Sequence, residues 1–307
     1  MKILFAISLL VVVVCGSVGA QQTADTAFLP VIDTPTYESG SGPVVMIDEA
    51  HNNFHTADGR FLPFAELLRR DGYTVKGSAT AFVLDSLKTG DVLVISNALH
   101  ERNTEEWSLP TPSAFTAEEI ETVRQWVEAG GSLFLIADHM PFPGAAADLA
   151  GTFGIIFNNG FALDTLKRGP PIFNRTHKTM LSQMITNGRN ETERVDSVAS
   201  FTGQAFQDDN PDFQPLMVLD SGYISLVPDT AWVFNESTEI VPVEGWYQGG
   251  VLTYGKGRVA IFGEAAMFTA QKVVVDDEER RAGMNTPVAE QNLQFLLNLM
   301  RWLTGTP

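Results

Sequence analysis

Cysteine and positive charge are both scarce in this chain of 307 residues. The single cysteine, Cys15, excludes a disulfide framework, a thiolate zinc finger and an iron–sulfur cluster within the chain. Lys and Arg total 20 against 37 Asp and Glu, which gives a formal net charge of −17. Because a phosphate-bearing partner needs a basic surface, this balance argues against DNA, RNA and anionic membranes as partners.

Long apolar runs are absent beyond the first twenty residues. Met1 and Lys2 precede an apolar run from Ile3 to Val14, and small residues follow up to Ala20. This pattern is typical of a secretory signal peptide, and the run is shorter than the roughly 20 residues that a membrane span needs. We therefore expect residues 1–20 to be removed. The mature protein would be secreted or periplasmic, with no stable membrane anchor and no cysteine.

Two familiar catalytic motifs are also missing. The chain has no G-x-S-x-G elbow, so a serine triad hydrolase ranks lowest among the enzyme classes. The segment Val44–His51 reads V-V-M-I-D-E-A-H, which looks like the metal-binding box of a helicase. That box works beside a phosphate loop, and no G-x-x-x-x-G-K-[ST] sequence is present. A nucleotide-driven enzyme is therefore not indicated.

Apolar runs and amphipathic segments alternate from residue 43 onward. Val44–Ile47, Val92–Ile95 and Leu133–Ile136 are short continuous apolar runs, as in strands buried on both faces. Thr116–Ala129 has a helical apolar stripe, and Thr116 with Glu119 forms a capping box at its start. Such alternation predicts an α/β fold with a mostly parallel central sheet.

The remaining segments define the expected organisation. Residues 21–42 are rich in Thr, Ser, Pro and Gly and predict a linker or N-terminal arm before a single α/β domain at 43–305. Residues 160–240 are polar and rich in turns, which predicts an insertion with short strands such as Ala231–Phe234. Gly255-Lys256-Gly257 predicts the turn of a β-hairpin. The charged residues 276–281 predict a solvated loop, and Thr286-Pro287 predicts the start of a final helix that runs to about Leu303.

Chemically versatile side chains follow several of the predicted strands. Ligands of open α/β sheets bind outside the carboxyl ends of the strands, so these positions are the candidates for a site. The candidate catalytic residues are Glu49, Asp138, His139 and Glu264. The candidate ligand-binding residues are Asn52, Asn53, Ser96 and Asn97.

Histidines dominate the same positions and raise the alternative of a metal centre. The candidate ligands are His51, His55, His100 and His139, with Asp48 or Asp138 completing the shell. Imidazole and carboxylate together suit zinc or another first-row divalent ion, which would acidify a bound water. The alternatives are hydrogen bonding of these imidazoles to loops and a metal-free acid–base pair that includes Asp138 and His139.

Four segments together resemble the class I glutamine amidotransferase-like superfamily, and in particular its secreted members of unknown function and its ThuA-like branch. They are Val44–Asn53, Trp126–His139, Tyr254–Val259 and Asn292–Leu303. The resemblance implies a flavodoxin-like three-layer sandwich. Amidotransferases carry a cysteine on a sharp strand–helix turn, and the similar turn here is Asp138-His139-Met140, without a thiol. The resemblance therefore does not extend to glutamine hydrolysis.

The sequence leaves two functions open. One is a hydrolase, with or without a divalent metal, that acts on an extracytoplasmic small molecule or glycan. The other is a non-catalytic ligand-binding or scaffold domain of the same fold. Convergence of His51, His55, His100 and His139 would favour a site, and their separation would weaken the metal hypothesis.

Overall fold

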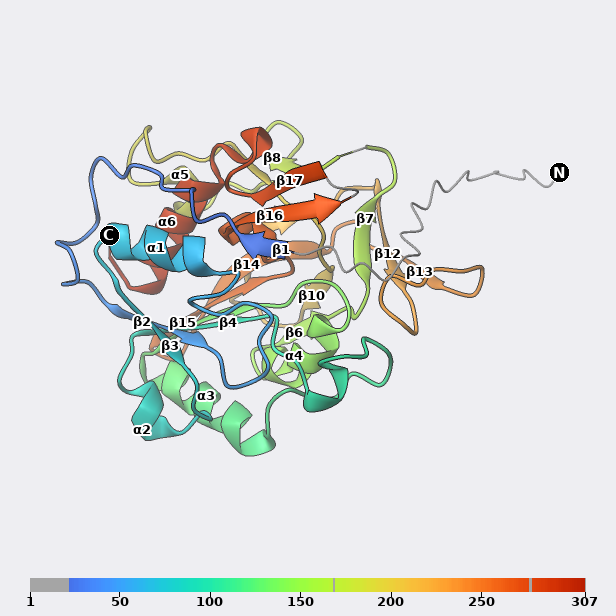
Figure 1. Ribbon diagram of the computed structural model, residues 1–307, viewed down its shortest axis with the longest axis horizontal. Helices are drawn as coiled ribbons and strands as arrows, with labels where there is room; N and C mark the ends of the chain where they lie inside the picture. Colours follow the sequence, from blue (N-terminus) through green and yellow to red (C-terminus); the bar gives the residue numbers. More distant parts are fainter. Residues whose placement is uncertain (1–21, 168, 276–277, 307) are drawn as a thin grey trace.

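A nine-stranded sheet forms the centre of the protein in a computed structural model, which describes residues 22–167, 169–275 and 278–306 (Figure 1). The predicted signal peptide at 1–20 lies outside these residues. The order of the strands across the sheet is β3 (Thr74–Ser78), β2 (Val44–Asp48), β4 (Val92–Ser96), β5 (Ser132–Ile136), β15 (Gly257–Phe262), β14 (Tyr247–Tyr254), β10 (Phe206–Asp208) and β6 (Ile155–Phe157). The ninth strand, β11 (Gln214–Val218), pairs with β14.

The sheet is mixed, so the prediction of a mostly parallel, flavodoxin-like sandwich is wrong. Four neighbouring pairs, from β3 through β15, are parallel. The other four pairs, which join β15, β14, β11, β10 and β6, are antiparallel. Parallel neighbours need a crossover of a dozen or more residues, whereas only residues 255–256 separate β14 from β15. This predicted hairpin is confirmed, and it reverses the chain where a crossover would have kept the strands parallel.

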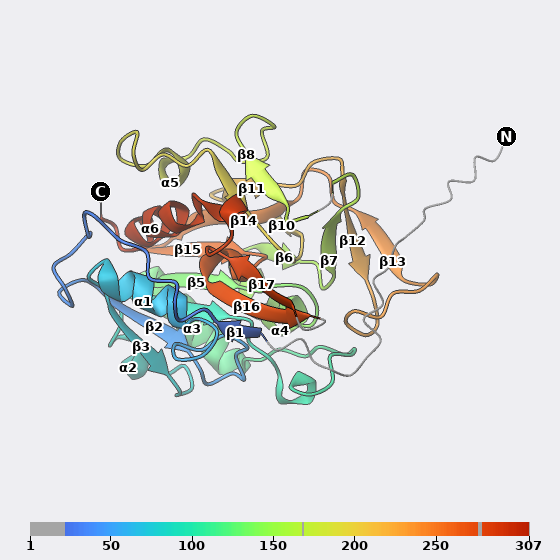
Figure 2. The same cartoon turned by 45° about the horizontal axis from the view of Figure 1, so that its top comes forward.

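Helices cover both faces of the sheet (Figure 2). On one face, α1 (Leu62–Arg70) and α6 (Asn292–Leu303) pack against alternate side chains of the central strands, such as Val45 and Phe134. On the other face, α2 (Leu84–Leu87), α3 (Ala117–Ala129) and α4 (Phe142–Gly151) pack against the intervening side chains, such as Met46 and Leu133. The period-2 alternation of a strand thus divides each apolar run between two cores.

Helix ends follow the local chemistry. The predicted capping box of α3 is present, since Thr116 Oγ1 accepts from Glu119 N and the Glu119 carboxylate accepts from Thr116 N. The final helix is shorter than predicted, because a 3₁₀ turn at Pro287–Ala289 precedes α6. Other short helices are α5 (Met184–Asn187) and the 3₁₀ turns Glu101–Asn103 and Ala266–Phe268.

In the described part of the chain, three small sheets flank the central one. They consist of β1 (Gln22–Ala24), β16 (Ala270–Val275) and β17 (Glu278–Gly283); of β13 (Glu239–Pro242), β12 (Tyr223–Val227) and β7 (Phe161–Asp164); and of β8 (Ile172–Asn174) with β9 (Ser197–Ala199). The predicted loop at 276–281 is wrong from Glu278 onward, where β17 pairs with β16, and 276–277 lie outside the described residues. The predicted strand Ala231–Phe234 is part of the loop between β12 and β13.

The segment 160–240 is divided between the main sheet and the small sheets. Its strands β10 and β11 join the main sheet, and β7 and β12 form a separate small sheet. Within the described parts of the chain, no helix has both the length and the apolar character to cross a membrane.

Candidate functional site

The carboxyl ends of the parallel strands bring several candidate residues to one edge. Asp48 ends β2 and Ser96 ends β4, while Asp138 and Glu264 each follow by two residues the ends of β5 and β15. These four strands are neighbours in the order β2, β4, β5 and β15. The predicted placement of these side chains at one sheet edge is therefore observed.

Asp138 and Glu264 form a buried pair of carboxyl groups. Ile136 pairs with Phe262 in the parallel register of β5 and β15, so both acids lie at the same level of adjacent strands. Asp138 is 9% exposed and Glu264 is fully buried. Burial raises the pKa of Asp138 to about 7, although hydrogen bonds from His139 N, Ala265 N and Asn97 oppose the rise. Burial and the charge of Asp138 raise the pKa of Glu264 well above its usual range. Near neutral pH, the pair therefore retains a proton.

The backbone holds Glu264 in place. Its Oε1 accepts from Ala266 N at 2.8 Å, and its Oε2 accepts from Met267 N at 2.8 Å. Both amides belong to the 3₁₀ turn that follows β15. Glu264 therefore has a fixed orientation, with no path for direct contact with a solute.

Asn97 connects the ends of β4 and β5. It adopts a left-handed backbone conformation with φ of 52°, which asparagine tolerates better than most residues. Its Oδ1 accepts from Asp138 N at 2.9 Å, and its own N donates to Ile136 O at 3.0 Å. The predicted ligand-binding residue Asn97 is thus a support for Asp138.

His139 is a neutral imidazole beside the carboxyl pair. Burial lowers its pKa to about 4, even though its bond to the carbonyl of Met140 raises it. Its Nδ1 donates to Met140 O at 2.7 Å, which makes Nε2 the nitrogen with a free lone pair. His139 N also donates to Asp138 Oδ1 at 2.9 Å. A neutral imidazole therefore directly follows a carboxyl group that releases its proton only near pH 7.

Aromatic side chains surround His139. Its ring stacks on Phe161 with the centroids 4.6 Å apart and an interplanar angle of 11°. Trp232 meets the ring edge-on at 4.6 Å, and Trp107 and Phe142 lie at 6.0 and 5.8 Å. This low-polarity surrounding accounts for the lowered pKa of His139.

His51 has a different role from His139. Its Nδ1 lies 2.9 Å from both carboxylate oxygens of Asp48, and its Nε2 lies 3.0 Å from Glu119 Oε1. Burial alone would lower the pKa of His51, but hydrogen bonds and charge from Asp48 and Glu119 raise it. His51 therefore joins the end of β2 to the start of α3.

His55 is buried and neutral. Its Nδ1 lies 3.1 Å from Ser96 Oγ, and its Nε2 lies 3.2 Å from Gln271 Nε2. Burial, together with the nearby charge of Arg60, lowers the pKa of His55 to about 3. Ser96 and His55 thus tie the end of β4 to β16.

The predicted metal ligands do not converge. Over 22–167, 169–275 and 278–306, no group of three or more His, Cys, Asp or Glu side chains is placed to hold a metal ion. The imidazoles of His51, His55 and His139 each have the separate partners described above, and His100 Nδ1 accepts from Arg102 N in a 3₁₀ turn. The donor set of these four histidines therefore does not fit a divalent cation.

Three other candidates are engaged in local structure. Glu49 Oε1 accepts from Ala57 N at 2.8 Å. Asn52 donates to Leu99 O, and Asn53 donates to Asp48 Oδ2. These residues shape the loop after β2, which is separated from β5 by β4.

Sequence reasoning missed Gln204 and the aromatic residues. Gln204 Nε2 donates to Ala137 O at 3.3 Å, immediately before Asp138. Trp107, Phe161 and Trp232 come from three loops or strands far apart in the sequence, so only the tertiary fold unites them. Their one visible signal was the aromatic content of Ala231–Phe234 within a polar region.

Comparisons with known proteins address the fold. No family model and no curated protein matches the chain. Among solved structures, the N-terminal domain of mmIFT52 is similar with a TM-score of 0.60 and 13% identity, over 85% of this chain and 97% of that one. A cytoplasmic protein from Salmonella typhimurium has a TM-score of 0.50 and 15% identity, over 85% and 99% of the two chains.

The structural neighbours also include a ThuA-like protein from Bacteroides uniformis. Its TM-score is 0.47 and its identity 12%, over 90% of this chain and 94% of that one. At such identities the likeness concerns the fold alone. The function must therefore be argued from the site.

Proposed function

We propose that this protein is a metal-free acid–base hydrolase that acts on a neutral small molecule or glycan outside the cytoplasm. The observation that carries the proposal is the proton-retaining pair Asp138–Glu264 next to the neutral imidazole of His139. A buried carboxyl group whose pKa is raised to about 7 is typical of acid–base sites. The acidic net charge disfavours anionic substrates.

The proposed roles follow from which groups a substrate could reach. Nε2 of His139 takes a proton from water as the water oxygen attacks the substrate. Asp138, whose carboxyl group is kept protonated by burial below about pH 7, gives a proton to the departing oxygen. Bond formation to water and cleavage of the substrate bond then balance, and the proton on His139 returns to Asp138 at the end of the cycle. Glu264 is a positioning residue, since its carboxyl group is fully buried.

A non-catalytic binding domain is the second candidate. The observation that favours it is the double backbone capping of Glu264, which is also typical of a structural buried acid. We further propose secretion through residues 1–20 and membership of the ThuA-like branch of the glutamine amidotransferase-like superfamily. These proposals depend on the sequence pattern and on a likeness of fold.

The test is hydrolysis of a panel of nitrophenyl glycosides and esters by the mature chain. Asp138→Asn and His139→Ala should each lower kcat/KM by at least about 100-fold, the scale of one lost proton-transfer group. Asp71→Asn is the matched control, since Asp71 is a fully buried acid that is bonded to Thr36 outside the site. Equal activity of Asp138→Asn and wild type, or no hydrolysis of any panel member, would contradict the proposal.

A further inference from the structure

A buried glutamine joins the two strand ends that carry the carboxyl pair. Gln204 lies between β9 and β10 and is fully buried. Its Nε2 donates to Ala137 O at 3.3 Å, one residue before Asp138. Its backbone N donates to Gly263 O at 2.9 Å, one residue before Glu264. A single residue therefore contacts the chain directly ahead of both acids.

The side-chain oxygen of Gln204 is also engaged. Its Oε1 accepts from Asn158 N at 3.1 Å, immediately after β6. The amide thus uses its donor group and its acceptor group at the same time. Rotation of this side chain would leave buried polar atoms without partners, which costs free energy. The orientation of Gln204 is therefore fixed.

The residues that precede Gln204 lie directly against Glu264. The carboxyl group of Glu264 accepts a hydrogen bond from the backbone of Thr202. A Cβ atom added to Gly203 would meet Glu264 Cβ at 3.0 Å and would collide with Gly263 O. A residue without a side chain is needed for so close an approach of two backbones.

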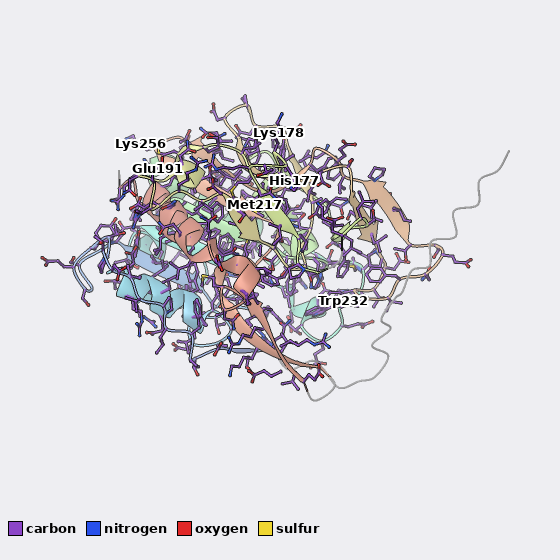
Figure 3. The ribbon with its side chains drawn as sticks, turned by 90° about the horizontal axis from the view of Figure 1, so that it is seen from above. His177, Lys178, Glu191, Met217, Trp232 and Lys256 are labelled. Carbon is purple, nitrogen blue, oxygen red and sulfur yellow. The ribbon has the colours of Figure 1, made fainter. Side chains whose placement is uncertain are left out.

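Gln248 supports this segment from β14. Its Nε2 donates to Gln204 O at 3.4 Å, and Ser200 Oγ donates to its Oε1 at 2.6 Å. Met217 of β11, labelled in Figure 3, pairs with Gly249 beside Gln248. Met217 and Gln248 are both buried, so the main sheet backs the segment that contacts the acids.

We propose that Gln204 is a positioning residue, which holds the ends of β5 and β15 together so that Asp138 and Glu264 remain a close pair from which water is excluded. Close approach matters because two carboxyl groups that share a site do not both ionise readily. Separation of the strand ends, or entry of water, would ease the ionisation of both acids. This inference rests on the proposed function for its role in the reaction, but the protonation of the pair can be measured without catalysis.

The experiment is a carbon-13 NMR titration of the chain labelled at the aspartate carboxyl carbons, from about pH 3 to about pH 9. Loss of one signal in Asp138→Asn identifies Asp138, which should titrate near pH 7 in the wild type because burial raises its pKa to about 7. His139 is neutral around that midpoint, since burial lowers its pKa to about 4.

Two substitutions of Gln204 carry the test. Gln204→Ala and Gln204→Met should each lower the midpoint of Asp138 by at least about one pH unit, since both remove the amide while Met retains most of its volume. If hydrolysis is found, Gln204→Met should lower kcat and leave KM unchanged. Gln271→Met is the matched control, because Gln271 is 2% exposed and its side chain bonds to His55.

Gln204→Asn covers the case in which neither of these variants folds. It keeps an amide at the buried position but is one methylene shorter, so it cannot reach Ala137 O and Asn158 N together. The midpoint of Asp138 should then fall by at least about half a pH unit.

The outcomes separate this inference from the hydrolase. A lowered midpoint in the Gln204 variants, with no hydrolysis by the wild type, supports the positioning role and contradicts the hydrolase. An unchanged midpoint, a fall in Gln204→Ala alone, or an equal fall in Gln271→Met overturns the positioning role only. A wild-type midpoint at the ordinary value of 3.8 overturns both.

Discussion

Replacing Asp138 by asparagine should change how stability depends on pH. Burial raises the pKa of this carboxyl group to about 7, whereas an unfolded chain releases the same proton near its ordinary value of 3.8. Between these values the folded protein binds more protons than the unfolded one, so the free energy of unfolding falls as pH rises. The asparagine of the variant has no proton to lose. Its side-chain oxygen can still accept from His139 N, as Asp138 Oδ1 does at 2.9 Å.

The magnitude follows from the displaced titration. A shift of one pKa unit corresponds to about 1.4 kcal/mol. The folded protein holds the extra proton up to about pH 7, so about two pH units of this interval lie between about pH 5 and about pH 8. The wild type should therefore lose about 3 kcal/mol more stability than Asp138→Asn over this interval. Since Asp138 is only 9% exposed, little screening by solvent reduces this value.

The assay is urea denaturation of both proteins at about pH 5 and about pH 8, with linear extrapolation to water. Glu290→Gln, which removes an exposed carboxylate, is the control and should follow the wild type. Parallel pH profiles for wild type and Asp138→Asn would show that Asp138 is an ordinary ionised carboxylate. Such a result would refute both the retained proton and the acid role.

Three further outcomes are expected. Glu119→Ala should destabilise the fold by about 2–4 kcal/mol at neutral pH, because it leaves buried His51 with one anionic partner and removes the capping box. Hydrogen bonds from Thr116, His51 and Phe82 overcome burial and lower the pKa of Glu119 to about 2, so the stability difference between wild type and variant should shrink as the pH falls from the unfolded value of 4.5 toward 2. A stability difference that stays constant over this pH range would refute this reasoning. Phe134→Ala should cost about 3–5 kcal/mol in chemical denaturation, because its fully buried ring contacts the rings of Phe262 and Phe268, and a loss under about 1 kcal/mol would contradict this packing. Dialysis of the untagged chain against zinc should leave far less than one equivalent by elemental mass spectrometry, and stoichiometric zinc that is lost in His51→Ala/His139→Ala would restore the metal hypothesis.

Local patterns predicted the central strands and the best helix well. The apolar runs at Val44–Ile47, Val92–Ile95 and Leu133–Ile136 each lie in a strand, and Thr116 caps α3 as expected. The antiparallel direction of the other half of the sheet was less predictable. The hairpin at 255–256 was recognised, but the antiparallel partners of β14 come from residues 206–218, whose short strands carry little periodic signal.

For the candidate site, the sequence predicted where the acids lie but not the roles of the histidines. Strand ends correctly placed Asp138 and Glu264 at one edge, because parallel strands carry their carboxyl ends to the same side. The histidines could not be sorted from sequence, since the role of each imidazole depends on a partner distant in the chain. Glu119 makes His51 an ion-pair partner, and Gln271 fixes buried His55, whereas Phe161 and Trp232 enclose His139.

The position of β15 has a consequence for how the chain folds during synthesis. Residues 257–262 lie between β5 and β14, so both halves of the central sheet depend on a strand made late in translation. The pairing of β1 comes later still, because its partner for Gln22 is Val273, about 250 residues further along the chain. During synthesis, the edge of β5 would thus stay unpaired until about the last sixth of the chain leaves the ribosome. This unpaired edge is the surface that a chaperone would have to cover.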